Sequence, residues 1–504
     1  MKVKNLSKIV KSNTWWSEEC PGVPLFCQWM QQFVEQSKYW HPKLPNIIFC
    51  FIKNDFIYEE TPEKQKLKIW DYILRQYQKD SRIQKMRYRQ WLKLVSAIKK
   101  EGEYFLKHRR QMTNQEFVDS FLKVVETLRD HWRFTWVLES ADIFTTYNLP
   151  KLIQKEKSKL SLQQATDVAI TLTAPTVLSF MEYYQIDLLK LAITYFSKLH
   201  NKRKLPPSLQ AELKLLAGKY IWLLSNYKEG RELTWQKVWA QIKFQLLSKN
   251  LSVLKTELKQ LSNKGHRNKV KQKHLYKDLS LSDKLIKSCQ LLSWWSRWID
   301  ERKQMALLGN WYLEHYARET ARRLKLDVWQ VKYMLAEEIV SALSDKKNVS
   351  VEDLNKRRKL SLFLTVKENN HTVNGVIVGA KAQKLWQAMF SNVLCKEIKG
   401  QVASAPVDKI EGIAQIVLDP HKDKFTAGRI LVTTMTRPDF VPLMRRAKAI
   451  ICDEGGITSH AAIISRELGM PCIIGTKIAS KQLKNGGKIK LDLNMGTVSV
   501  ISSK

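Results

Sequence analysis

Glycine and proline are scarce in this chain, with 18 and 14 residues among 504. Both residues interrupt helices, and apolar residues recur at spacings of three and four in segments such as 63–101, 115–138 and 208–226. These patterns predict a mainly helical region up to about Leu360. The same region contains no P-loop and no glycine-rich strand–turn–helix that could cradle phosphates. One exception to the helical pattern is the apolar run 46–52, which is either a strand or a buried irregular segment.

Cysteine and long apolar runs are also lacking. The seven cysteines are odd in number and scattered, with no Cys-x-x-Cys pair, which predicts a reducing cytoplasmic setting and argues against a cysteine metal site. No apolar run reaches the roughly 18–20 residues of a membrane span. Residues 1–20 lack the apolar centre of a signal peptide, so we expect no membrane association.

Acidic residues are few: the chain has 48 of them and 85 basic residues, which gives a net charge of +37. Such a charge attracts anionic partners, including nucleic acid. However, the basic residues are spread along the whole chain, and this distribution is more typical of solvated helix faces that bind nothing in particular. The densest stretch runs from Lys249 to Lys287. We expect its centre, residues 263–274, to be an exposed loop between helices. It could contact nucleic acid or an acidic subunit, but it matches no named recognition motif.

Tryptophan, by contrast, is abundant, with 17 residues that cluster at helical spacings. This spacing is more typical of core packing than of ligand stacking. His131 and His315 lie on predicted helices as possible acid/base groups. For both, a packed or exposed histidine without a chemical role is the preferred interpretation.

The pattern changes after residue 360. Residues 362–378 read as a hairpin and 380–390 as a helix, and strands are expected at 412–418 and 428–432. We therefore predict a multidomain protein of α plus α/β class. Its parts are a mainly helical domain (1–360), a linker of hairpin and helix (361–394), and a compact layered α/β domain (395–504).

The most informative segment lies in this last domain. Ala449–Cys452 is short and apolar like a buried strand, and Gly455 and Gly456 end it. Ser459 is a good N-cap for a helix over residues 460–468, which Gly469 closes. His460 therefore belongs to the first turn of a helix after a glycine loop.

That position suits a phosphoryl-accepting nucleophile. Unpaired backbone N–H groups and the helix dipole favour an anion at a helix start and disfavour imidazolium, which leaves a neutral imidazole. The hydroxyls of Thr458 and Ser459 could hold phosphoryl oxygens. Asp453 could orient His460 through a hydrogen bond or simply favour the turn. The alternative is a histidine that only completes a helix cap.

Four stretches of this region, 434–444, 447–451, 455–462 and 466–472, together resemble the swivelling phosphohistidine domain of phosphoenolpyruvate synthases, pyruvate phosphate dikinases and rifampicin phosphotransferases. The resemblance implies that His460 is phosphorylated and carries the group between two active sites. It places Thr458 and Ser459 beside the phosphoryl group, with Gly455 and Gly456 shaping the loop.

Arg437 and Arg466 are candidates for phosphoryl or interdomain contacts, and surface salt bridges explain them equally well. Residues 301–339 are more weakly similar to the helices that join the other domains of these enzymes. In rifampicin phosphotransferases a helical acceptor-binding domain directly precedes the swivelling domain, and the order here is alike.

Neither a nucleotide-binding domain nor a phosphoenolpyruvate-binding barrel is apparent in the sequence. We therefore expect ATP and Mg²⁺ to bind a separate ATP-grasp-type subunit that phosphorylates His460, and an unidentified acceptor to bind near the helical domain. No metal or cofactor motif is found in this chain. The competing hypothesis is a non-catalytic basic protein that binds RNA or another protein and keeps the phosphohistidine fold as a scaffold.

Overall fold

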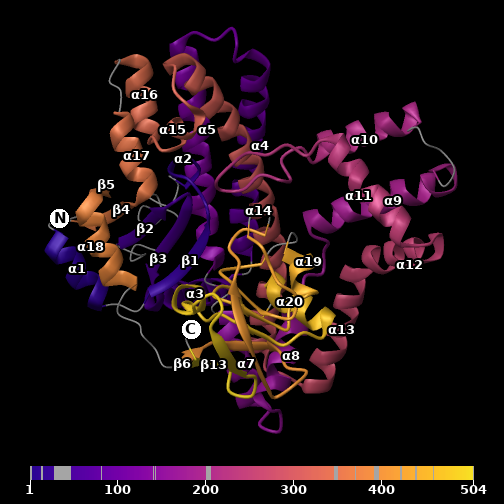
Figure 1. The fold of residues 1–504 in the computed structure, drawn as a ribbon. Coiled ribbons are helices and arrows are strands. Elements are labelled where there is room, and N and C mark those ends of the chain that lie inside the picture. Colours follow the sequence, from indigo (N-terminus) through magenta and orange to yellow (C-terminus); the bar gives the residue numbers. More distant parts are fainter. Residues whose placement is uncertain are drawn as a thin grey trace.

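The computed structural model describes residues 3–12, 15–27, 47–80, 82–139, 141, 144–199, 206–345, 350–368, 371–390, 397–420, 423–436, 440–457 and 459–502. Within these ranges a large, mainly helical N-terminal region precedes a C-terminal domain built on a mixed sheet, which confirms the α plus α/β class (Figure 1). None of the helices in this part of the chain is long and apolar enough to cross a membrane.

An antiparallel five-stranded sheet belongs to the N-terminal region. In spatial order its strands are β1 (Trp15–Pro21), β3 (Phe56–Pro62), β2 (Ile47–Lys53), β4 (Ser361–Glu368) and β5 (His371–Val378). The apolar run at 46–52 is thus a strand, β2, and it is central. Its alternate side chains enter two cores: Ile48, Cys50 and Ile52 face the helices, and Phe49 and Phe51 face the opposite side. Burial on both faces explains why this strand is apolar throughout.

The predicted hairpin is formed by β4 and β5, and β4 pairs with β2 from Ser361 to Val366. The hairpin is therefore part of the N-terminal sheet rather than a free connection. The face of the sheet that carries Phe49 and Phe51 is covered by α1 (Val3–Ser12) and α18 (Gly379–Phe390). Residues 391–396, which follow, lie outside the described ranges.

The helical region is assembled around α14 (Asp283–Leu324), a helix of 42 residues. Trp295, Trp298 and Tyr316 of this helix are fully buried, as the packing interpretation of the tryptophan clusters predicts. The other helical elements outside the C-terminal domain are α2 (Pro24–Cys27), α3 (Glu63–Lys79), α4 (Arg82–His108), α5 (Asn114–Thr135), η2 (Trp136–Glu139), η3 (Phe144–Asn148), α7 (Leu149–Glu156), α8 (Leu162–Thr173), α9 (Phe180–Leu199), α10 (Pro207–Lys219), α11 (Trp235–Ser248), α12 (Leu251–Ser262), α13 (Lys264–Leu279), α15 (Val328–Lys332), α16 (Ala336–Ser344) and α17 (Val351–Lys359).

The basic stretch at 263–274 departs from the prediction of an exposed loop. Apart from Asn263, where α12 ends, its residues belong to α13. The prediction was wrong because lysine, arginine and glutamine are good helix formers, and charge alone does not signal a loop. One side of α13 is also anchored, since Gln272 Nε2 donates to the carbonyl oxygens of Thr171 and Ala174 at 3.2 and 2.8 Å.

The C-terminal domain contains an eight-stranded mixed sheet. Its strands, in spatial order, are β6 (Glu397–Lys399), β13 (Thr497–Ser502), β12 (Lys488–Asp492), β8 (Lys409–Ile416), β9 (Ile430–Thr433), β10 (Ala449–Cys452), β11 (Cys472–Ile474) and β7 (Gln401–Ser404). The strands β8, β9, β10 and β11 run parallel, and the others pair antiparallel.

Alternation along the central strands divides the apolar side chains of this domain between two faces. Leu431, Ile450 and Cys452 pack with α19 (Val441–Met444) and α20 (His460–Leu468). Ile430 and Ile451 pack on the other face, with α21 (Ala479–Gln482).

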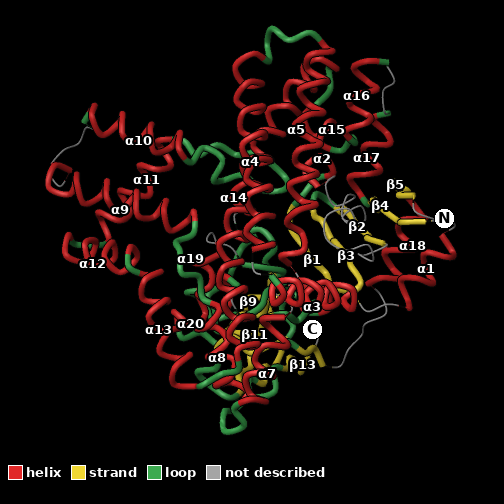
Figure 2. The backbone as a smooth tube through the Cα atoms, turned by 180° about the vertical axis from the view of Figure 1, so that it is seen from behind, coloured by secondary structure: helices red, strands yellow, loops and turns green. Residues whose placement is uncertain are grey.

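The C-terminal domain contacts the N-terminal region through several side chains, and Figure 2 shows it beside α7 and α8. Ile457 is fully buried in the same apolar cluster as the helical core. Lys481 Nζ lies 5.3 Å from the ring centroid of Tyr58 and 4.4 Å from that of Phe390. Arg466 and Asp167 of α8 attract each other electrostatically. The loop before His460 is therefore held at the boundary of the two parts.

Candidate functional site

His460 begins α20, as the sequence predicts. The preceding strand is Ala449–Cys452 and the helix is His460–Leu468, with the bounds expected from the sequence. Ser459 has extended backbone angles, and its hydroxyl accepts a hydrogen bond from the Ala462 N–H at 3.4 Å. Gly469 closes the helix with a φ of +61°. The N-cap and C-cap signals in the sequence thus act where they were expected.

The loop that leads to His460 needs its first glycine. Gly455 has a φ of +105°, in the region that favours glycine. A Cβ atom at this position would lie 2.7 Å from both Cβ and Oγ of Ser459. A side chain here would therefore push against the N-cap that positions His460. Gly456 follows without such a constraint on its φ, and the Ser459 N–H donates to its carbonyl oxygen at 2.9 Å.

The imidazole of His460 is held by Thr436. The Thr436 Oγ1 and His460 Nδ1 atoms are 2.8 Å apart, a hydrogen-bond distance, and Thr436 is buried while His460 is partly exposed. The strands β9 and β10 are parallel neighbours, so the segments after their carboxyl ends leave the same edge of the sheet. The Glu454 N–H donates to the Thr434 carbonyl oxygen at 2.8 Å and ties these two segments together.

Thr436 was missed in the sequence. It lies within the stretch 434–444 that carries the family resemblance, but no local pattern distinguishes it from its neighbours. The signal that could have found Thr436 is its position just after a predicted strand, β9. Because β9 and β10 are parallel neighbours, the segment that holds Thr436 begins at the same sheet edge as the His460 loop.

Asp453 does not bond to His460. Its carboxylate accepts hydrogen bonds from Thr476 Oγ1 at 2.7 Å and from the N–H and hydroxyl of Ser480, the N–H lying 3.1 Å from Oδ2. Burial raises the pKa of Asp453, and the hydrogen bonds from Ser480 and Thr476 oppose this rise. The carboxylate therefore braces the end of β10 against the start of α21. Of the two roles considered, shaping the turn fits these contacts and orienting the imidazole does not.

Arg466 supports the loop from the other end of α20. Its guanidinium donates to the carbonyl oxygens of Ile457 at 2.8 Å and Ala403 at 3.4 Å. Burial lowers the pKa of Arg466, and the nearby Asp167 partly offsets this effect. These bonds make Arg466 a loop-fixing and interdomain residue rather than a surface salt bridge. Arg437 and Thr458 lie outside the described residues.

The two other histidines considered lie in the helical region. His131 is completely buried in α5, and its Nδ1 accepts a hydrogen bond from Trp91 Nε1 at 2.9 Å. Burial, with the nearby Arg302, lowers the pKa of His131 to about 3. His315 is partly buried with its Nε2 3.4 Å from Glu232, and burial lowers its pKa as well. His131 fits the packed histidine of the sequence interpretation.

Among the described residues, no group of three or more His, Cys, Asp or Glu side chains is arranged to hold a metal ion. The site thus consists of a histidine at a helix start, a threonine that holds its Nδ1, a glycine loop and a serine cap.

Comparison with known proteins assigns this domain. Residues 425–496 match the family described as PEP-utilising enzyme, mobile domain. The phosphoenolpyruvate synthase of Pyrococcus furiosus is 52% identical over 102 residues, which are 20% of this chain and 12% of that protein. The phosphoenolpyruvate synthase of Aquifex aeolicus is 30% identical over 207 residues, 40% of this chain and 21% of that protein. The second alignment is longer than residues 395–504 and so includes residues outside the C-terminal domain.

The C-terminal domain therefore belongs to the mobile-domain family of PEP-utilising enzymes, and the family resemblance drawn from the sequence is confirmed. The chain spans only 12% and 21% of the length of these two relatives. Among solved structures, aconitase X of Thermococcus kodakaraensis aligns with 21% of this chain and 98% of its own, at 22% identity and a TM-score of 0.18. A score this low establishes no shared fold.

Proposed function

We propose that this chain is a phosphotransferase component in which His460 accepts a phosphoryl group and passes it to an acceptor bound near the helical region. The observation that best supports this proposal is the 2.8 Å contact between Thr436 Oγ1 and His460 Nδ1 at the start of α20. Both residues lie inside the domain that matches the mobile-domain family. In this proposal the donor is ATP, bound with Mg²⁺ on a separate ATP-grasp-type subunit.

In this proposal Nε2 is the nucleophile, and the Thr436 hydroxyl accepts from the other ring nitrogen. When Thr436 Oγ1 accepts a hydrogen bond from Nδ1–H, the lone pair of the neutral ring is on Nε2. In the first transfer Nε2 forms a bond to phosphorus while the P–O bond to the leaving group of the nucleotide breaks. In the second transfer an oxygen of the acceptor attacks the phosphorus, the N–P bond breaks, and Nε2 regains its lone pair.

The start of α20 supplies favourable electrostatics for this intermediate. A helix N-terminus carries a partial positive charge, which stabilises an anion by about 0.3–1 kcal/mol at exposed sites. The Ser459 and Thr458 hydroxyls are proposed to contact the phosphoryl oxygens. Positioning and charge neutralisation supply most of the rate in phosphoryl transfer, so a rigid loop matters as much as the nucleophile.

The interdomain contacts support an acceptor near the helical region. Ile457, three residues before His460, is buried in the helical core cluster, and Arg466 of α20 is attracted by Asp167 of α8. The arrangement therefore corresponds to a docked position of the histidine loop. A swivelling motion would then carry His460 between this position and the donor subunit. The free thiols of Cys289, Cys452 and Cys472 support a reducing, cytoplasmic setting for this reaction.

Labelling with ATP tests the proposal. The protein is incubated with the candidate ATP-grasp subunit, Mg²⁺ and ATP labelled at either the β- or the γ-phosphate. We expect an alkali-stable, acid-labile label on the wild-type chain. His460→Ala and His460→Gln should take up no label, and a label on His460→Gln would mean that another residue is the carrier. Equal labelling of wild type and His460→Ala would overturn the proposal.

The competing function is a binding protein that uses the phosphohistidine fold as a scaffold. Its net charge of +37 is the observation that favours it. Salt-sensitive RNA binding by a chain that takes up no phosphoryl group would support this alternative.

A further inference from the structure

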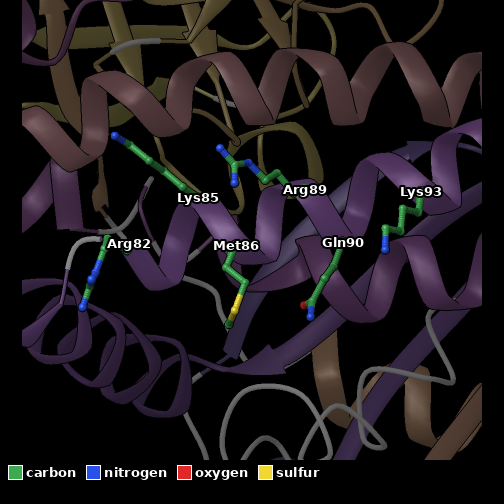
Figure 3. Close-up of a pocket in the computed structure, with 6 residues that line it drawn as sticks. All are labelled: Arg82, Lys85, Met86, Arg89, Gln90 and Lys93. Carbon is green, nitrogen blue, oxygen red and sulfur yellow. The ribbon is translucent and has the colours of Figure 1, made fainter.

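A strongly basic pocket lies on α4, in the helical region and outside the site of His460. It has a volume of about 590 Å³ and is lined by Arg82, Lys85, Met86, Arg89, Gln90 and Lys93. Four of these six side chains are cationic, and none is acidic. Figure 3 shows Lys85 and Arg89 on one side of the helix and Arg82, Met86 and Gln90 on the other.

The spacing of these residues arranges them in two parallel rows. Lys85, Arg89 and Lys93 are four residues apart, and so are Arg82, Met86 and Gln90. Residues at this spacing are neighbours on a helix surface, with Cβ atoms about 5–6 Å apart. The first row is therefore a line of three adjacent positive charges, and like charges at this spacing destabilise a helix.

Among the residues that the structure describes, no negative charge compensates this row. Lys85, Arg89 and Lys93 are exposed and have no ion pair or side-chain hydrogen bond to any described residue. No acidic residue occurs from Arg82 to Lys100. Other cations nearby are paired. Lys123 of α5 lies 2.5 Å from Glu101 of α4, and Arg133 lies 2.6 Å from Asp130, both on α5. Of the four cations in the pocket, Arg82 is the one with an ion-pair partner in the described part of the chain, Asp80, at 3.0 Å.

We propose that this pocket binds a small molecule that carries two or more phosphate groups. The three unpaired cations and the Gln90 amide supply charge-assisted and neutral hydrogen-bond donors, and Met86, which is 53% exposed, offers an apolar contact for the organic part. The volume lies within the range of about 300–1,000 Å³ that is typical of small-molecule sites. The pocket has no aromatic lining residue on which the bases of a single-stranded nucleic acid would stack, so RNA fits it less well.

Calorimetric titration of the full chain tests this site, with tripolyphosphate and orthophosphate as probes. We expect tripolyphosphate to bind with a stoichiometry of one and more tightly than orthophosphate. The variant Lys85→Gln/Arg89→Gln/Lys93→Gln should bind it at least about tenfold more weakly, since it removes three cationic hydrogen-bond donors. All three side chains are exposed, and circular dichroism and thermal unfolding verify that the variant is folded.

The matched control removes the same charge from α13, as Lys269→Gln/Lys271→Gln/Lys273→Gln. These lysines are also exposed, and the control should bind tripolyphosphate within about twofold of wild type. Equal losses in both variants would overturn the proposal, because they would mean that only net charge matters. Tighter binding of an RNA oligonucleotide through the same three residues would also overturn it. Labelling of His460 is measured separately, so failure here leaves the carrier proposal intact.

Discussion

At the scale of single residues, the imidazole of His460 is oriented by a side chain that lies 24 positions earlier in the sequence. Thr436 Oγ1 sits 2.8 Å from Nδ1, and Asp453, the nearer candidate in sequence, is bonded to Thr476 and Ser480 instead. A hydroxyl in this place holds the ring orientation without introducing a charge, and it can either accept from Nδ1–H or donate to the Nδ1 lone pair.

Removal of the Thr436 hydroxyl should slow phosphorylation of His460. We expect Thr436→Val to lower the rate of label uptake about tenfold, because loss of one hydrogen bond changes a free energy by roughly 1 kcal/mol or somewhat more. Thr436→Ser keeps the hydroxyl and should stay close to wild type. Uptake by Thr436→Val at the wild-type rate would show that the contact does not orient the nucleophile.

His131 should make the protein sensitive to acid. Its pKa is about 3 in the folded chain and about 6.5 when unfolded, so below pH 6.5 the unfolded state binds a proton that the folded state does not. Its contribution to stability is therefore fully present above pH 6.5 and is lost as pH falls toward 3, with a slope of about 1.4 kcal/mol per pH unit.

Urea unfolding at pH 7.5 and pH 5.0 measures this effect. The variant His131→Asn keeps an acceptor for the Trp91 N–H, and the stability difference between the two pH values should shrink by about 1–2 kcal/mol relative to wild type. An unchanged difference would mean that other groups dominate the acid response.

At the scale of elements, the loop between β10 and α20 keeps its shape through the backbone conformation of Gly455 and through hydrogen bonds from neighbouring elements. The left-handed conformation of Gly455 and the 2.7 Å approach to Ser459 leave no room for a side chain. Hydrogen bonds from Arg466 to the Ile457 carbonyl oxygen and from Ser480 to Asp453 hold the same loop from outside. The loop is thus held in place by contacts from several elements.

Gly455→Ala should therefore impair both stability and phosphorylation. We expect a loss of about 1–3 kcal/mol in unfolding free energy, because a non-glycine residue is strained at this φ. Gly218→Ala is the matched control: its Cβ would contact nothing within 4 Å in α10, and alanine there should stabilise the chain by about 0.5–1 kcal/mol. If thermal unfolding shows the two variants alike, the loop tolerates a side chain.

At the scale of the whole molecule, the C-terminal domain is docked on the N-terminal region by a few contacts. Two of them join Lys481 to the aromatic rings of Tyr58 and Phe390, which belong to the sheet and to α18. The proposed transfer requires the domain to leave this position, so we expect the interface to be only moderately stable.

Lys481→Glu should shift the domain away from the docked position. Cation–π contacts contribute about 0.5–2 kcal/mol, so the equilibrium constant for docking should fall by roughly two- to thirtyfold. Small-angle X-ray scattering should show a larger radius of gyration, with phosphorylation of His460 retained. Lys484→Glu, three residues away and exposed, is the control and should scatter like wild type. The same scattering curve for both variants would exclude a role for Lys481 in docking.

The sequence by itself determined the local unit from Ala449 to Gly469, with the bounds of its strand and helix. It could do so because the signals are local: an apolar strand, two glycines, a serine cap and a closing glycine act on their immediate neighbours. The apolar run that forms β2 was also visible, although its strand character was not decided.

Only the tertiary structure decided the contacts between distant segments. It brought Thr436 to His460, turned Asp453 toward Ser480, and paired β4 with β2 across more than three hundred residues of chain. It also made α13 a helix anchored on α8, where charge alone suggested a loop. These outcomes depend on which elements share a sheet edge or a core, and no short stretch of sequence encodes that.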